Sequence, residues 1–113
     1  MTRHVIPFEK LRMTDVSEVG GKNASLGEMI SQLAASGVRV PGGFATTAAA
    51  YRDFLAGSGL ADRINRLLDT LDVDDVDALM KTGAQIRQWI VEAPLQADFE
   101  AAIKREYETL TGA

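Results

Sequence analysis

The sequence of 113 residues contains no cysteine and a single histidine, His4. Without cysteine the chain has no disulfide framework, no cysteine-ligated zinc or iron–sulfur cluster and no thiol nucleophile. One histidine without a fixed acidic neighbour builds neither a histidine metal site nor a Ser-His-Asp triad, so we predict a surface position for His4. The absence of cysteine fits a reducing compartment most simply.

The chain also lacks a long apolar run. Polar and apolar residues are mixed from Met1 through Arg12. This segment has neither the apolar core of about 7 to 15 residues of a signal peptide nor the roughly 18 apolar residues of a membrane helix. We therefore expect a cytoplasmic protein without a membrane partner.

Positive charge is in the minority. The chain has 12 lysines and arginines against 16 aspartates and glutamates, which gives a formal net charge of −4 at pH 7. Surfaces that bind nucleic acid carry excess positive charge, so we expect no nucleic-acid partner. The hydrophobic fraction of 46% is typical of a folded soluble domain. Because no linker, repeat or low-complexity tract interrupts residues 1–113, we predict a single domain.

Apolar residues recur at helical spacing in five segments, which predicts about five helices. Thr46 or Thr47 can cap the second helix, and Asp74 or Asp75 can cap the fourth. The last helix is expected to turn Leu110 inward. The five predicted helices cover about residues 23–36, 47–57, 60–71, 75–93 and 96–110.

A short extended region is predicted between the first two helices. Val38-Arg39-Val40 alternates apolar and polar residues, and Phe44-Ala45 follows the turn Pro41-Gly42-Gly43. We therefore predict a mainly α fold with a short β segment near residues 38–47.

Gly20-Gly21-Lys22 leads directly into the first predicted helix. A helix N-terminus presents unpaired backbone N–H groups and a partial positive charge, which suit a phosphate group. Glycines let the backbone approach closely, and Lys22 adds a positive charge. However, the segment matches neither the P-loop nor the dinucleotide-binding pattern. From these residues alone, a tight turn followed by a solvated lysine is the commoner outcome.

Three other features have simple structural explanations. Pro41-Gly42-Gly43 is more often a turn than a ligand contact. The aspartates between Asp69 and Asp77 do not fit a calcium loop, because Gly83 stands where a loop beginning at Asp72 needs glutamate; helix capping explains them better. Arg87 and Trp89 can form a cation–π pair or a partner surface, although a position half-covered by the core is the commoner outcome.

Three segments, read together, resemble the phosphoenolpyruvate synthase (pyruvate, water dikinase) family. Their order and spacing are similar to the N-terminal part of that family from about residue 8 to the end of the chain. The first two segments are shared with pyruvate, phosphate dikinase and related phosphotransferases, whereas the third favours the synthase. The segments are Val19–Met29, Val40–Thr47 and Gly83–Ile90.

The resemblance implies the leading part of an ATP-grasp-like α+β nucleotide-binding domain. The family converts ATP, pyruvate and water to AMP, phosphoenolpyruvate and phosphate with Mg²⁺, through a phosphohistidine on a swivelling domain. In the family the lysine of the Gly-Gly-Lys motif contacts the ATP phosphates, so the resemblance implies Lys22, with Gly20 and Gly21, as the ATP-binding residues here. The implied partners are the rest of the nucleotide-binding domain, the phosphohistidine domain and the pyruvate-binding domain.

Other parts of the family's machinery are missing from these 113 residues. The family's second phosphate-holding arginine, its Mg²⁺ ligands and its phosphorylated histidine have no counterpart here, so we expect a fragment with no catalytic residue and no activity by itself. Gly42 stands where many relatives have a second proline, which loosens that turn. The alternative that we keep open is a non-catalytic helical interaction module, whose exposed apolar face would favour self-association.

Overall fold

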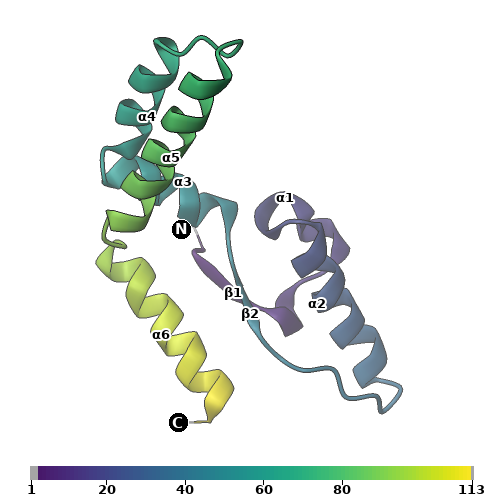
Figure 1. Cartoon of the computed structure of the whole chain (residues 1–113). Helices are drawn as coiled ribbons and strands as arrows, with labels where there is room; N and C mark the ends of the chain where they lie inside the picture. The colour runs from purple at the N-terminus through teal and green to yellow at the C-terminus, as the bar shows by residue number, and fades with distance from the viewer. Residues whose placement is uncertain (1–2, 113) are drawn as a thin grey trace. The chain divides into compact units, whose positions relative to one another are not determined.

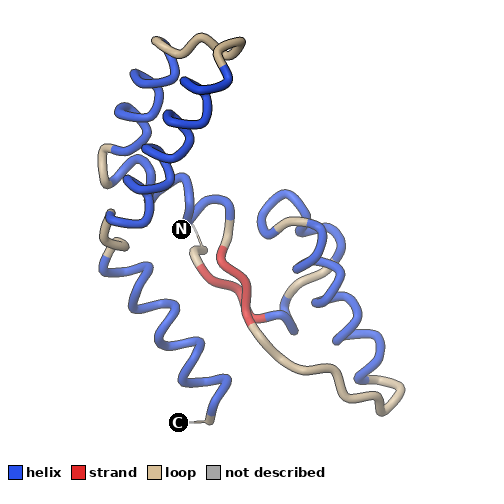
Figure 2. The backbone as a smooth tube through the Cα atoms, viewed as in Figure 1, coloured by secondary structure: helices blue, strands red, loops and turns tan. Residues whose placement is uncertain are grey.

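The computed structural model describes residues 3–112, which form six α-helices, two short 3₁₀ helices and one two-stranded sheet (Figures 1 and 2). This architecture confirms the predicted mainly α fold with a short β segment. In chain order the elements are β1 (Val5–Pro7), η1 (Phe8–Lys10), η2 (Met13–Asp15), α1 (Val16–Val19), α2 (Gly21–Ala34), β2 (Phe44–Thr46), α3 (Ala48–Gly57), α4 (Leu60–Asp69), α5 (Val76–Glu92) and α6 (Ala97–Thr111).

The chain divides into two compact units. The first comprises the described residues of Met1–Arg52 and Ala97–Ala113, and the second comprises Asp53–Gln96. The single domain predicted for residues 1–113 stays a prediction. None of the helices within residues 3–112 is both long enough and apolar enough to cross a membrane.

The sheet of the first unit joins two strands that are far apart in sequence. β1 and β2 are antiparallel, with Ile6 opposite Ala45, and both side chains are buried. Beyond the strands, the amide of Phe8 donates to the carbonyl of Gly43 (2.9 Å). The sequence did not predict β1, because three residues ending in proline carry too little alternation. The predicted extended segment at residues 38–40 is not part of a strand.

The core of the first unit lies between the sheet and α2. Its buried residues are Ile6, Leu11, Val19, Ala24 and Ala45, with Phe8 packed against them. Gly27 allows α2 to approach this core closely: a Cβ atom there would overlap the side chain of Leu11 and lie 2.7 Å from the carbonyl oxygen of Phe8. Backbone atoms cannot move aside as a flexible side chain can, so the packing requires glycine.

His4 is not at the surface, and that prediction is wrong. Its side chain is only 15% exposed. The imidazole ring packs edge-on against Phe99 of α6 at a centroid distance of 5.7 Å, and Nδ1 lies 4.0 Å from a carboxylate oxygen of Asp98. The amide of Thr47 holds the His4 backbone by donating to its carbonyl (3.0 Å).

In the second unit, α4 and α5 pack against each other as a helical hairpin (Figure 1). Leu60 is 1% exposed and begins α4. Asp75 caps α5 as predicted, since its carboxylate accepts from the amide of Ala78 (3.1 Å). The helix ends at Glu92, before the predicted break at Ala93-Pro94.

The helix predictions agree with the structure to within a few residues. The helix expected from Asn23 begins at Gly21, and the short helix α1 before it was not predicted. The cap expected at Thr46 or Thr47 is Thr47, whose hydroxyl accepts from the amide of Ala50 (3.1 Å). The inward placement of Leu110 is wrong, because its exposed fraction is 49%.

Candidate phosphate-binding helix start

Gly20 is the junction between α1 and α2. Its amide donates to the carbonyl of Val16 (2.8 Å) and closes α1, while its carbonyl accepts from the amide of Ala24 (3.1 Å) and opens α2. The backbone dihedral angles of Gly20 are φ 84° and ψ 164°. This region of backbone space is unfavourable for residues with a Cβ atom, which explains the glycine.

Asn23 fastens the two helices together across this junction. Its side-chain amide donates to the carbonyl of Val19 at the end of α1 (2.9 Å). The next residue, Ala24, is completely buried under the turn. The junction at Gly20 is therefore held by a side-chain hydrogen bond from Asn23 of α2 as well as by the backbone.

The start of α2 is open on its outer side. A Cβ atom added to Gly20 or Gly21 would meet no heavy atom within 4 Å, and Lys22 is exposed. The first turn contains no acidic residue and has no side-chain cap. Its free N–H groups and the positive end of the helix dipole are thus available to an anion.

The three predicted site residues are consecutive in the sequence and lie at this helix start. A phosphate group fits the donor set, because backbone N–H groups, a partial positive charge and the ammonium of Lys22 all favour an anion. The open space over both glycines also allows close approach of the phosphate to the backbone. Within residues 3–112, no group of three or more acidic or histidine side chains is arranged to hold a metal ion.

The turn predicted at Pro41-Gly42-Gly43 is wrong: these residues form an irregular extended segment before β2, and their glycines pack closely against other residues. A Cβ atom on Gly43 would lie 2.7 Å from a ring carbon of Phe8, and one on Gly42 would touch Leu110 at 3.4 Å. The absence of a side chain at Gly43 therefore allows the Phe8 ring to lie against the backbone that leads into β2.

The aspartates around residues 69–77 also act locally. Asp75 caps α5, and Asp72 accepts from the backbone amide of Asp74 (3.0 Å). The predicted capping function is confirmed for Asp75.

Trp89 is half-buried and forms a cation–π pair with an arginine of the neighbouring helix. The guanidinium carbon of Arg63 on α4 lies 4.3 Å from the centre of the Trp89 ring. The sequence allowed a pair of Trp89 with Arg87 on the same helix or a half-covered position, and it gave no sign of a pair with Arg63. Packing of α4 against α5 explains the difference, because it brings residues together that are 26 positions apart.

Comparison with known proteins assigns the chain to a family. The chain belongs to the pyruvate phosphate dikinase, AMP/ATP-binding domain family, whose model matches residues 16–113. The class of protein is thus that of a nucleotide-binding domain.

The similar proteins are phosphoenolpyruvate synthases, which confirms the resemblance. The chain is 62% identical over 110 residues to phosphoenolpyruvate synthase of Pseudomonas aeruginosa, with 97% of the chain covered. It is 59% identical to that of Neisseria meningitidis and 55% identical to that of Escherichia coli, each over 107 residues and 95% of the chain. The chain spans 14% of the length of each of these relatives.

Proposed function

We propose that this chain is part of the nucleotide-binding domain of a phosphoenolpyruvate synthase, and that Gly20, Gly21 and Lys22 bind the phosphates of ATP. The whole enzyme would convert ATP, pyruvate and water to AMP, phosphoenolpyruvate and phosphate in the cytoplasm, through a phosphohistidine on another domain. The observation that carries the proposal is the uncapped, lysine-bearing start of α2 in a chain of an AMP/ATP-binding family.

Each residue of the helix start has its own task in this proposal. Gly20 turns the chain so that α2 begins where α1 ends, and Gly21 keeps the approach to the first N–H groups free of side-chain atoms. Lys22 supplies a full positive charge to the phosphates. Mg²⁺, bound by residues elsewhere in the enzyme, would neutralise further phosphate charge.

Exposed apolar side chains support the view that other parts of the enzyme cover this unit. Met13 on η2 is 49% exposed, Val16 on α1 is 42% exposed and Met29 on α2 is 43% exposed. We propose that the rest of the nucleotide-binding domain covers them, and that the phosphohistidine and pyruvate-binding domains complete the enzyme.

An amide-resolved NMR titration of the chain with MgATP tests the phosphate site. Binding by part of a site is expected to be weak, with a dissociation constant of about 1 mM, or roughly −4 kcal/mol. We expect shifts concentrated at Gly20 to Ser25 that disappear in Lys22→Ala. The matched control is Lys81→Ala, which removes an exposed lysine from α5 and is expected to leave the titration unchanged.

Two results would contradict the phosphate site. One is the absence of shifts at about 10 mM MgATP, tenfold above the expected constant. The other is an unchanged response in Lys22→Ala.

A second candidate function is a non-catalytic helical interaction module, which the same exposed apolar side chains favour. This alternative predicts concentration-dependent self-association in sedimentation equilibrium and no response of the α2 start to MgATP. A monomer that responds to MgATP rejects it.

A further inference from the structure

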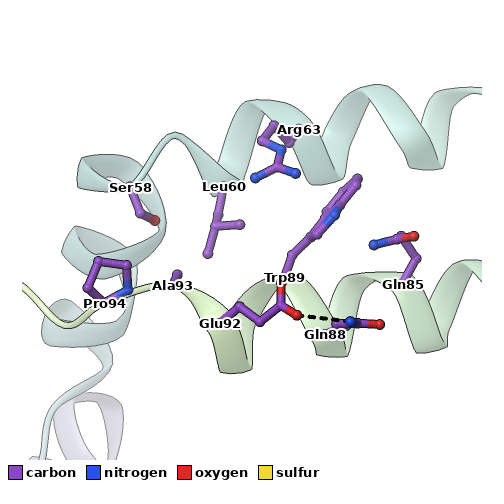
Figure 3. Close-up of a pocket in the computed structure, with 9 residues that line it drawn as sticks. All are labelled: Ser58, Leu60, Arg63, Gln85, Gln88, Trp89, Glu92, Ala93 and Pro94. Carbon is purple, nitrogen blue, oxygen red and sulfur yellow. Dashed lines mark hydrogen bonds between the residues drawn. The ribbon is translucent and has the colours of Figure 1, made fainter.

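The hairpin of α4 and α5 contains a hollow of about 500 Å³ that has no part in the proposed phosphate site (Figure 3). This volume lies within the range of about 300 to 1,000 Å³ that is typical of ligand pockets. All the residues that line it belong to the second compact unit. They include Leu60, Arg63, Gln85, Gln88, Trp89 and Glu92.

The exposed side chain of Arg63 lines this hollow, and its guanidinium donors are free. It lies over the ring of Trp89, and within residues 3–112 it forms neither a hydrogen bond nor an ion pair with another side chain or carbonyl. Stacking restricts the plane of a guanidinium and leaves its N–H edge available for a carboxylate. Arg63 is thus oriented before any ligand arrives.

Apolar side chains lie on one side of this exposed charged group. Leu60 is 1% exposed and Trp89 is half-buried, and Ala93 and Pro94 line one end of the hollow (Figure 3). Tryptophan and arginine are the residue types that dominate binding energy in protein interfaces. A ligand that joins a carboxylate to apolar groups matches this surface, because the carboxylate can pair with Arg63 while the apolar groups contact Leu60 and Trp89.

The opposite wall carries a negative charge and two side-chain amides. Glu92 on α5 accepts a hydrogen bond from the side-chain amide of Gln88 (2.9 Å), and Gln85 lies one turn before Gln88 on the same helix (Figure 3). A ligand with several negative charges, such as a polyphosphate, would be repelled by Glu92. A peptide avoids this repulsion, because its main chain presents N–H donors beside a single acidic side chain.

We infer that this hollow, named here the Arg63–Trp89 pocket, binds an acidic segment of a partner protein, with one aspartate or glutamate carboxylate on Arg63. The main chain of the segment pairs with the amides of Gln85 and Gln88 and with Glu92, and its apolar side chains contact Leu60 and Trp89. This inference does not depend on the phosphate site at Lys22.

Trp89 is the only tryptophan of the chain, so its fluorescence reports on the pocket directly. The probe is the capped peptide Ala-Leu-Glu-Leu-Ala, titrated into the whole chain. We expect a saturable change with a dissociation constant of about 1 mM or tighter. The matched peptide with glutamine in place of glutamate is expected to bind at least tenfold more weakly.

Variants of the chain locate the binding. Arg63→Gln is expected to weaken the binding of the glutamate peptide at least tenfold. Arg63→Lys is expected to weaken this binding several-fold, because lysine lacks the planar set of N–H donors of a guanidinium. The matched control is Arg66→Gln, which removes the same charge from α4 but lines the neighbouring hollow on Trp89. Its affinity is expected to stay within twofold of that of the unchanged chain.

Several results would overturn the inference. They are a glutamate peptide without a saturable effect at about 10 mM, equal binding of the two peptides, or unchanged binding in Arg63→Gln. If sodium acetate or free glutamate binds as tightly as the peptide, the pocket takes a small carboxylate and the protein partner is rejected. The peptide comparison uses the unchanged chain, so it decides the question even if Arg63→Gln fails to fold.

Discussion

The side-chain amide of Asn23 donates a hydrogen bond of 2.9 Å to the backbone carbonyl of Val19, across the glycine junction between α1 and α2. The carbonyl lies at the end of α1, where no residue of that helix follows to donate to it. One side chain therefore stabilises both the end of α1 and the junction from which α2, with Lys22 in its first turn, begins.

The first prediction concerns this hydrogen bond. Asn23→Ala is expected to lower the free energy of unfolding by about 1 kcal/mol, the usual effect of losing a hydrogen bond to a partly buried carbonyl. Chemical denaturation followed by circular dichroism measures the change. The control is Asn65→Ala on α4, an exposed position, which is expected to be neutral or slightly stabilising because alanine favours helix. Equal effects of the two variants would contradict the role of Asn23.

The second prediction compares two helical glycines. Gly27→Ala places a Cβ atom against the carbonyl oxygens of Phe8 (2.7 Å) and Leu11 (2.8 Å), and is expected to destabilise the chain by about 1 to 3 kcal/mol. Gly83→Ala meets only a flexible atom of Arg87 at 3.3 Å. It is expected to stabilise α5 by up to about 1 kcal/mol. Denaturation curves of both variants test the opposite signs.

The third prediction compares the effect of Gly20 on stability with the effect of Gly21 on MgATP binding. Gly20→Ala is expected to lower the free energy of unfolding by about 1 to 3 kcal/mol, because φ 84° and ψ 164° define a backbone region that is almost restricted to glycine. Gly21→Ala places its methyl group in open space within the first turn of α2, so thermal unfolding is expected to change little. Its methyl group would occupy the approach of a phosphate, and the MgATP-induced shifts are expected to weaken at least several-fold. Unchanged MgATP binding in Gly21→Ala would argue against the proposed cradle.

The fourth prediction concerns turnover in the whole enzyme that contains this chain. If Lys22 contacts the ATP phosphates, Lys22→Ala removes a charge that stabilises the transferring group, and kcat/KM for ATP is expected to fall by about 100-fold or more. Lys81→Ala is the matched control and is expected to keep full activity. Near-normal turnover in Lys22→Ala would contradict the proposed contact of Lys22 with the ATP phosphates.

The candidate site was predictable only in part. Gly20, Gly21 and Lys22 stand out because glycines followed by a lysine at a helix start have a clear physical reason to attract an anion. The role of Asn23 had no such signal, since an asparagine near a helix start usually acts as a cap rather than reaching back to the preceding helix. Its function became visible only from the position of α1.

Local sequence determined where most helices begin and end. Thr47 caps α3, Asp75 caps α5 and Pro94 follows the end of α5; each signal acts on residues within one turn of itself. The same holds for the glycine junction before α2, where the unusual φ of Gly20 is a local property.

Tertiary structure decided which distant residues meet. Val5 pairs with Thr46, His4 packs on Phe99 and Trp89 stacks with Arg63. None of these pairs lies within one helical turn or one strand, so neither the helical nor the strand period of the sequence could reveal them. They form because the chain buries apolar surface only when separate elements pack against each other, and that packing selects the partners.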